Sequence, residues 1–585
     1  MLGIHTSAFP PGTWDTGYGA PLSDAGQRLL TFAARLGFTA LQLGPSGQVS
    51  QANLSPYDGT VFARNTWSID LRVLTEREWG PLLPADIADR LALGPVAASR
   101  VQPQRVDRIV REAADACYQG LVRLRTDEPD HPLLLAFDRF RVDQRGWLEL
   151  NAAYEVIAGR KGDDPDRFDS DTRALFAPGA GGPHRRTAWR AAAAAAFECR
   201  ELAQFLCHAQ HATFRSLARA EGLALWGDLQ VGFSHRDRFL HADCFTPRWW
   251  LGAPPSRTNP DGQPWGYPVL DPDQLDDPTS PARQLFELRL RKLLAEYDGV
   301  RIDHPHGLVC PWIYAAADPD RYGAVRRGTR AFASPNSPDP DLARWAIARS
   351  TNLNPAAGSP FADDWVRDLD ESQVSRYARL LDALVSLSQD RGRARDVVAA
   401  EVLSTCPYPL SRVLARHGLG RFRVTEKFDP SDPNDPYRTE HARPEDWLML
   451  GTHDTPPALP LATQWVVDGR AVPRATYLAD RLIDDPAARR AAAERFAGSA
   501  PELLGASLAD LFGSRAESVY VFIGDLFGET EPFNRAGIIH PDNWTARLPA
   551  DFERVYAERL HAGRALDIVA ALRLALTRTL PELPV

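Results

Sequence analysis

The sequence predicts an α/β fold: a (β/α)8 barrel of the TIM type with inserted, largely helical subdomains and no separate C-terminal β domain. Short apolar β-like runs recur along the chain, and stretches with apolar residues three and four positions apart lie between them. Strands that alternate with helices indicate a parallel sheet whose two faces are covered. We expect eight strands, a number that favours a closed barrel over an open sheet, at residues 2–5, 39–44, 223–228, 299–303, 397–401, 422–425, 447–451 and 518–523.

The 585 residues are expected to form one decorated catalytic domain, 1–585, because α/β barrels routinely exceed the usual domain size of about 150 residues. Roughly 180 residues separate the second strand from the third, which is too long for a barrel connection alone. Segments rich in Pro, Gly, Asn and Ser predict further loops. We therefore expect three approximate insertions: a helical subdomain at 75–215, a loop subdomain over the cleft at 247–285 and an extended loop and helix region at 305–396.

The composition excludes several classes of protein. Hydrophobic residues make up 44% and charged residues 24%, close to globular averages, so the chain as a whole is neither disordered nor fibrous. The net charge is −9 and no basic stripe with interleaved aromatics occurs, so nucleic acid is not an expected partner. We find no leader-like N-terminus and no run of 18 apolar residues, so no membrane association is expected. The six cysteines lack paired spacings and are expected to be free thiols of a cytoplasmic protein.

Acidic residues stand at or just beyond the ends of four predicted strands: Asp228, Asp303, Glu401 and Asp454. Chemistry in such barrels takes place at the carboxyl ends of the strands. Arg301 lies two residues before Asp303, so both side chains share one face of the strand. A neighbouring guanidinium keeps a carboxylate ionised, as a nucleophile requires, although an ordinary Arg/Asp pair in a barrel layer is an equal alternative.

Glu401 and Asp454 complete the predicted set of acids. Glu401 follows an apolar strand, where burial and neighbouring carboxylates are expected to raise its pKa and suit it to general acid catalysis. Asp454 leaves its strand together with His453, but we find no third ligand in the sequence, so no metal is predicted. Three such acids fit retaining glycoside chemistry, in which one carboxylate attacks the anomeric carbon and a second, about 5 to 5.5 Å away, protonates the leaving oxygen.

Short motifs through nearly the whole chain carry a resemblance to a known family. They include Gly3-Ile-His-Thr-Ser-Ala-Phe-Pro, Ser55-Pro-Tyr-Asp-Gly-Thr, Gly227-Asp-Leu-Gln, Gly262-Gln-Pro-Trp-Gly, Arg301-Ile-Asp-His, Ala400-Glu, Gly451-Thr-His-Asp, Gly524-Asp-Leu-Phe-Gly, Asn534-Arg-Ala-Gly and Asn543-Trp. In this order they make the chain resemble the 4-α-glucanotransferases, also called amylomaltases or disproportionating enzymes, of glycoside hydrolase family 77. Each piece is short, and the specificity comes from their number and order.

The resemblance implies that Asp303 is the nucleophile, Glu401 the acid/base and Asp454 the stabiliser of the transition state. It implies that the glucan contacts five further residues: Tyr57, Asp228, Trp265, Arg301 and His453. Packing is the alternative for the two aromatic residues among them, and a hydrogen bond to backbone is the alternative for Asp228. His304, His306 and His5 are expected to be structural. No cofactor is implied, because two carboxylates supply both the nucleophile and the proton.

The expected reaction moves an α-1,4-glucan segment from a maltooligosaccharide or starch chain to the 4-OH of glucose or another glucan through a covalent glycosyl-enzyme. The alternatives are an α-glucan hydrolase, a transferase with a different acceptor, and a catalytically silent glucan-binding protein. The chain departs from the family pattern at Glu401-Val-Leu-Ser, where Glu-Asp-Leu-Gly is usual, and at Thr455, where Asn is commoner. These departures leave the acceptor and chain-length preferences open, and the sequence does not give the oligomeric state.

Overall fold

A computed structural model describes residues 1–92, 99–179, 181–256, 259–403, 405–538 and 540–577. All eight predicted strands are present in one parallel sheet whose order is β10-β11-β12-β1-β2-β3-β6-β9, which is the order of the chain around a barrel. The prediction of a (β/α)8 barrel is confirmed. Its strands are β1 (Leu2–Ile4), β2 (Ala40–Leu43), β3 (Ala224–Leu229), β6 (Gly299–Ile302), β9 (Val398–Ala400), β10 (Phe422–Val424), β11 (Trp447–Met449) and β12 (Ser518–Phe522).

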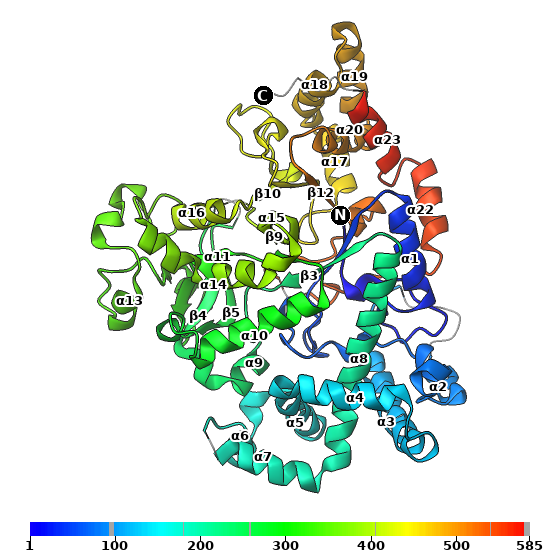
Figure 1. Ribbon diagram of the computed structural model, residues 1–585. Helices are drawn as coiled ribbons and strands as arrows, with labels where there is room; N and C mark the ends of the chain where they lie inside the picture. The colour runs from blue at the N-terminus through cyan, green and yellow to red at the C-terminus, as the bar shows by residue number, and fades with distance from the viewer. Residues whose placement is uncertain (93–98, 180, 257–258, 404, 539, 578–585) are drawn as a thin grey trace.

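Helices cover the outside of the barrel, as the three- and four-residue apolar spacing predicts (Figure 1). The helix α14 illustrates the local rules: Asp370 and Gln373 form a capping box at its start, which satisfies backbone N–H groups that the helix leaves unpaired. The helices of this part of the chain are α1 (Asp24–Arg35), α8 (Ala194–Ala220), α10 (Pro281–Glu296), α14 (Glu371–Ser388), α15 (Ala394–Val397), α16 (Tyr408–His417), α17 (Ala458–Val467), α20 (Ala500–Phe512), α21 (Ile523–Leu526), α22 (Phe552–His561) and α23 (Ile568–Leu576), and α18 (Ala471–Leu482) and α19 (Pro486–Gly498) pack on α20.

The long connection between β2 and β3 is helical in most of its described part and gathers in the lower part of Figure 1. Its helix α8 returns the chain to the barrel and buries Phe214 and Ala218 in the main core. The limits of a separate subdomain within 75–215 remain a prediction. The helices before α8 are α2 (Ala85–Leu91), α3 (Pro103–Asp127), α4 (Pro132–Asp143), α5 (Arg145–Lys161), α6 (Ser170–Leu175) and α7 (Gly181–Ala192).

Residues 245–330 contribute a second, antiparallel sheet. The expectation of loop structure at 247–285, and of a loop and helix region at 305–396, is therefore wrong where these strands lie. The order of this sheet is β5-β4-β7-β8. Gly and Pro suggested a loop, but Gly262 and Gly266 take positive φ values at the hairpin turn and in the strand after it, while the aromatic residues of β4 and β5 favour strands. The elements of this region are α9 (His235–Leu240), β4 (Phe245–Ala253), β5 (Gln263–Leu270), α11 (His306–Val309), β7 (Trp312–Ala315), α12 (Arg321–Arg326), β8 (Thr329–Arg330) and α13 (Pro340–Trp345).

The second sheet shares an apolar core with the barrel strands that carry two of the acids. Leu251 of β4 and Tyr267 of β5 belong to the same buried cluster as Val300 and Ile302 of β6. The hairpin of β4 and β5 is therefore fixed beside the carboxyl end of β6. After β12, no strand occurs in the described part of the chain.

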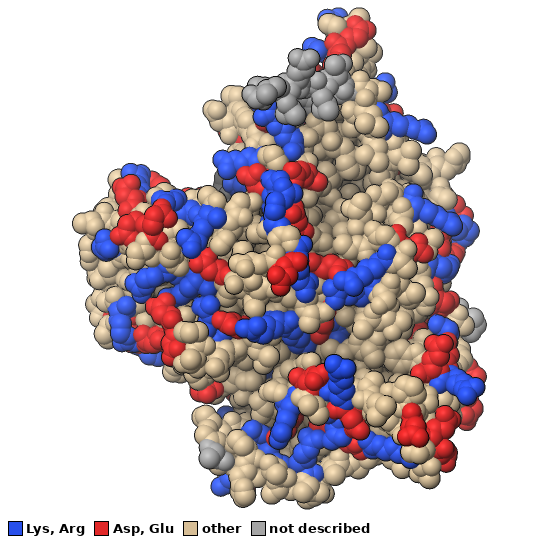
Figure 2. Space-filling view, in the orientation of Figure 1, with Lys and Arg blue, Asp and Glu red and all other residues tan. Residues whose placement is uncertain are grey.

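The surface carries both signs of charge, which are interspersed on the face shown in Figure 2. Among the residues described, no helix has both the length and the hydropathy to cross a lipid bilayer.

Candidate active site

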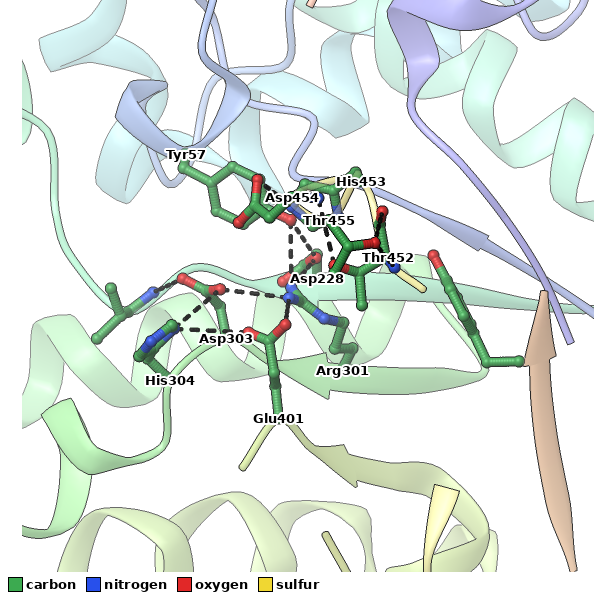
Figure 3. Close-up of polar contacts among 12 residues, drawn as sticks. Tyr57, Asp228, Arg301, Asp303, His304, Glu401, Thr452, His453, Asp454 and Thr455 are labelled. Atoms are coloured by element: carbon green, nitrogen blue, oxygen red, sulfur yellow. Dashed lines mark hydrogen bonds and ion pairs between the residues drawn. The ribbon is translucent and has the colours of Figure 1, made fainter. Parts of the chain in front are cut away.

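Strand register brings three of the predicted acids to one end of the barrel. Asp228, near the end of β3, is the direct partner of Arg301 on β6. The backbone ladder continues beyond the strands, since Asp303 N–H donates to Leu229 O at 3.0 Å and Glu401 N–H donates to Ile302 O at 3.0 Å. The three carboxylates therefore converge above the carboxyl ends of β3, β6 and β9 (Figure 3).

Arg301 is the cation at the centre of this cluster and is 5% exposed. Its Nη1 lies 2.5 Å from Asp228 Oδ2, and its Nη2 lies 2.5 Å from Glu401 Oε1 and 3.4 Å from Asp303 Oδ1. Nη1 also donates to the Tyr57 hydroxyl at 3.2 Å. The predicted contact between Arg301 and Asp303 is present, but the two closest partners of the guanidinium are Asp228 and Glu401.

These contacts decide the protonation of two carboxyls. Burial alone would raise the pKa of Glu401, but the positive charges of Arg301 and His304 outweigh burial and hold this pKa well below its ordinary value. The prediction of a raised pKa for Glu401 is therefore wrong. Burial raises the pKa of Asp228 to about 7, against the opposing effect of Arg301 and with reinforcement from the charges of Asp303 and Glu401.

The spacing of the two predicted catalytic carboxyls distinguishes two kinds of glycoside chemistry. One carboxylate oxygen of Asp303, one of Glu401 and a ring nitrogen of His304 all lie within 4.8 Å of one another. Retaining sites hold their carboxyls about 5 to 5.5 Å apart, and inverting sites hold them about 6.5 to 9.5 Å apart to admit a water. The close spacing fits the retaining arrangement.

The same three residues offer donor atoms that could surround a metal ion. Glu401 already pairs with Arg301 at 2.5 Å, so a cation would have to compete with a buried guanidinium for this carboxylate. The donor set therefore fits a cationic side chain better than a metal ion.

Asp454 reaches the site on a short turn after β11. The Thr455 hydroxyl accepts from Thr452 N–H at 2.8 Å, the Thr452 hydroxyl accepts from Asp454 N–H at 3.2 Å, and both bonds fix the turn. The side chain of Asp454 is 38% exposed, and its Oδ1 accepts from Asn534 Nδ2 at 2.6 Å. Thr455, a departure from the family pattern, thus has a local structural role.

His453 and Tyr57 link Asp454 to the carboxylate cluster. The His453 ring stacks on Tyr57 with centroids 5.4 Å apart and planes 13° apart, and its Nε2 lies 3.5 Å from Asp454 Oδ1. The Tyr57 hydroxyl donates to Asp228 Oδ2 at 3.1 Å. In the described part of the chain, no ion pair or hydrogen bond joins Asp454 directly to Asp303 or Glu401.

Two further aromatic residues pack against His453 and Tyr57. His5 lies 4.7 Å from His453, and Trp544 lies 5.6 Å from Tyr57, between ring centroids. Burial, with smaller contributions from His453 and Arg301, lowers the pKa of His5 well below its ordinary value, so this ring is neutral. The structural role expected for His5 agrees with this packing.

A cleft of about 1500 Å³ opens beside the cluster. Trp265 and Tyr267 of β5 line one part of it, and residues 534–538 and Trp544 line another. The half-buried Trp265 donates from Nε1 to Gln263 Oε1 at 2.7 Å, and its ring meets the edge of His304 at 5.1 Å. Trp265 therefore stands between the open cleft and the buried carboxylates.

Sequence reasoning missed two residues as members of the site. Asn534 lies in a quoted motif and contacts Asp454, but the motif alone did not indicate which of its side chains would do so. His304 was expected to be structural, yet its Nδ1 lies 3.7 Å from Asp303 Oδ1 and 3.6 Å from Glu401 Oε2. Its position directly after the nucleophile candidate was the available signal.

A parallel barrel with two close carboxyls at the carboxyl ends of its strands is the arrangement typical of retaining glycoside-processing barrels. Within this class, the family model described as 4-alpha-glucanotransferase, glycoside hydrolase family 77, matches residues 8–552. The chain belongs to this family.

Relatives with curated names agree with this membership. A 4-alpha-glucanotransferase of Thermus thermophilus is 27% identical over 309 residues, which are 50% of this chain and 55% of the relative. A 4-alpha-glucanotransferase of Streptococcus pneumoniae is 24% identical over 322 residues, which are 53% of this chain and 58% of the relative. The chain thus matches little more than half the length of these curated relatives.

Solved structures extend the likeness of fold over nearly the whole chain. An amylomaltase from Streptococcus agalactiae in complex with acarbose has a TM-score of 0.70 at 16% identity, covering 97% of this chain and 99% of that one. An amylomaltase from Corynebacterium glutamicum has a TM-score of 0.65 at 18% identity, covering 97% of this chain and 75% of that one. At such identities the likeness concerns the fold alone.

Proposed function

We propose that this protein is a retaining 4-α-glucanotransferase that moves α-1,4-glucan segments to the 4-OH of glucose or another glucan. One observation carries the proposal: the close pair Asp303 and Glu401, held by the buried Arg301 beside a large cleft in a chain of this family. We assign Asp303 as the nucleophile, Glu401 as the acid/base and Asp454 as the stabiliser of the transition state.

The reaction has two halves. In the first, an Asp303 oxygen bonds to the anomeric carbon of the donor while the bond to the leaving 4-oxygen breaks and that oxygen receives a proton from Glu401. In the second, the 4-OH of an acceptor gives its proton to Glu401 and displaces Asp303, which restores the α configuration. No cofactor is needed in this scheme, because the carboxylates supply the nucleophile and the proton.

Transfer rather than hydrolysis requires that an acceptor sugar reaches the intermediate before water does. A site that binds the acceptor and excludes solvent favours transfer. The hairpin of β4 and β5 and the segment around Asn534 line the cleft next to the carboxylates and are the elements we assign to this task. Starch or glycogen chains and maltooligosaccharides are the substrates proposed.

The five substrate-binding residues are proposed to divide into two groups by burial. Tyr57, Asp228, Arg301 and His453 are 9% exposed or less, so they touch only the sugar nearest the carboxylates. Trp265, which is half-buried and lines the cleft, is assigned to sugars farther along the glucan. A cytoplasmic location is also proposed, supported by the six cysteines, all of which are free thiols.

The first expected result concerns maltotriose as the sole substrate. Purified protein is expected to produce glucose together with longer maltooligosaccharides without a net increase in reducing ends, because each cleaved bond is replaced by a new one. Chromatography of the products and a reducing-end assay measure the two quantities. A stoichiometric rise in reducing ends would instead indicate an α-glucan hydrolase, and unchanged maltotriose combined with binding of maltodextrin would indicate a silent glucan-binding protein.

Replacement of the cleft tryptophan is expected to weaken glucan binding selectively. Trp265→Ala removes an apolar ring of the kind on which sugars stack and is expected to raise KM for maltoheptaose about tenfold, equivalent to about 1.4 kcal/mol. A smaller increase is expected for maltotriose, which spans fewer positions. Initial rates across both substrates measure this effect, with Trp465→Phe on α17 as a control remote from the cleft. Equal KM increases for both oligosaccharides would place the tryptophan at the reacting sugar.

A further inference from the structure

The backbone of His304 is strained at a functionally critical place. His304 directly follows Asp303, and its φ is +42°, a left-handed value that is costly for a residue with a Cβ. The next residue is Pro305, which pushes the residue before it toward extended backbone. Strain of this kind persists only where the surrounding structure imposes it, and it clusters at functional sites.

The strained backbone aims the imidazole at both catalytic carboxyls. His304 Nδ1 lies 3.7 Å from Asp303 Oδ1 and 3.6 Å from Glu401 Oε2, which are ion-pair distances (Figure 3). The edge contact with Trp265 holds the ring from the cleft side. The side chain is 36% exposed, whereas that of Glu401 is 4% exposed. His304 is therefore the more accessible of these two groups.

The titratable groups facing His304 are Asp303, Glu401 and His306. Burial opposes a charge on His304, but contacts with the two carboxylates outweigh it and raise the pKa of His304 to about 10. The His306 ring lies 5.9 Å away, and its Nε2–H donates to Thr405 O at 2.9 Å. Burial, followed by the charge of His304, lowers the pKa of His306 to about 3. Of the two histidines, His304 therefore carries the proton at neutral pH.

This arrangement raises a problem for the acid role of Glu401. A general acid must carry a proton when the leaving group departs. Glu401 is paired with Arg301 Nη2 through Oε1 and faces His304 Nδ1 through Oε2, and both cations favour its ionised form. Glu401 is thus ready to act as a base in the second half of the reaction and lacks the proton that the first half requires.

We propose that His304 supplies the proton that Glu401 delivers to the leaving group. In the first half-reaction the proton moves from His304 Nδ1 to Glu401 Oε2 and then to the leaving 4-oxygen, as Asp303 forms its bond to the anomeric carbon. The products are the glycosyl ester, a free 4-OH, ionised Glu401 and neutral His304. In the second half-reaction the proton of the acceptor 4-OH passes to Glu401 and returns to His304. This inference rests on the proposed function.

The chemistry of the intermediate explains the timing of the transfer. When Asp303 attacks, its negative charge is consumed, so the imidazolium loses one of its two anionic partners. Loss of a neighbouring opposite charge makes a cation release its proton more readily. His304 therefore gives up its proton at the stage at which the leaving oxygen needs one. His304 therefore acts through Glu401 and not directly on the leaving oxygen.

The test compares two donors in His304→Gln. Glutamine can hydrogen-bond at this position but carries no transferable proton. Transfer from maltotriose, whose leaving group must be protonated, is expected to fall about 100-fold, in the range of general acid catalysis. Transfer from α-maltosyl fluoride to maltose, in which fluoride departs without that proton, is expected to fall less than about threefold. Equal losses with both donors, or no loss with maltotriose, would overturn the proposal.

A second variant covers the case in which glutamine disturbs the site. Glycine tolerates positive φ, so His304→Gly is expected to fold, which circular dichroism verifies. Added imidazole is expected to raise the activity of this variant on maltotriose at least tenfold. No rescue in a folded variant would overturn the proposal. His417→Gln serves as the matched control, since His417 pairs with Asp382 on the outside of α14 and α16. Wild-type activity on maltotriose is measured first, so failure of the proposed function is seen before any variant is compared.

Discussion

Replacement of the proposed nucleophile, Asp303→Asn, is expected to lower glucan transfer by at least about 10⁴-fold, because an amide cannot attack the anomeric carbon. The side chain is 12% exposed and lies against Arg301 and the Val231 N–H, and asparagine keeps its shape and one accepting oxygen. The variant is therefore expected to fold and to bind maltoheptaose within a few-fold of the wild type. Initial rates with maltotriose and calorimetric titration with maltoheptaose measure the two effects.

Azide distinguishes the roles of the two carboxyls. In Asp303→Gly, azide can enter the space left by the carboxylate and attack α-maltosyl fluoride from the nucleophile side, which is expected to yield the β-azide. In Glu401→Ala, azide is expected to attack the glycosyl ester of Asp303 from the opposite side and to yield the α-azide. Nuclear magnetic resonance of the products identifies the anomer. Exchanged outcomes would reverse the two assignments, and Asp382→Asn, a surface change on α14, is expected to leave the rates unchanged.

The parallel barrel could be predicted because each of its strands carries a local signal. Short apolar runs ended by polar or Gly residues mark all eight strands, and chain order fixes their neighbours once the sheet is parallel. The second sheet could not be predicted in the same way. Its strand pairs are antiparallel and include β4 with β7, whose partners Trp250 and Tyr314 are far apart in sequence, and the Gly and Pro residues of β4 and β5 obscured the strand pattern.

The candidate site was predictable in most of its residues, though not in Asn534 and His304, and only partly in its electrostatics. Strand ends located Asp228, Asp303 and Glu401, since the carboxyl ends of parallel strands meet. The direction in which the pKa of Glu401 shifts depends on which carboxylates Arg301 approaches most closely. The sequence spacing indicated Asp303 as the partner of Arg301, whereas Asp228 and Glu401 are closer. The contact of His304 depends on a single left-handed backbone angle, which the position before a proline disfavours.

Removal of the central cation, Arg301→Met, is expected to destabilise the fold by about 3 to 5 kcal/mol near pH 8, the usual cost of leaving buried charges without their partner. Methionine fills much of the same space without charge, so three buried carboxyls lose the guanidinium that pairs with them. Transfer activity is expected to fall at least about 10²-fold, because the field around the reacting carboxylates changes. Arg301→Lys keeps the charge but not the fork of donors and is expected to be intermediate.

The loss of stability in Arg301→Met is expected to shrink as the pH falls from 8 to 5, and the sign follows from the carboxyl pKa values. In the wild type the folded pKa of Glu401 is lowered, so its stabilising contribution is present above about pH 4.5 and is lost below that value. Without Arg301, burial dominates, so the folded pKa of Glu401 rises and that of Asp228, which is already about 7 in the wild type, rises further. A carboxyl with a raised pKa stabilises the fold at low pH and loses that contribution as the pH rises through its folded value. Urea unfolding of both proteins at pH 5 and pH 8 measures the difference, and an equal loss at both pH values would show that Arg301 acts through packing rather than through its charge.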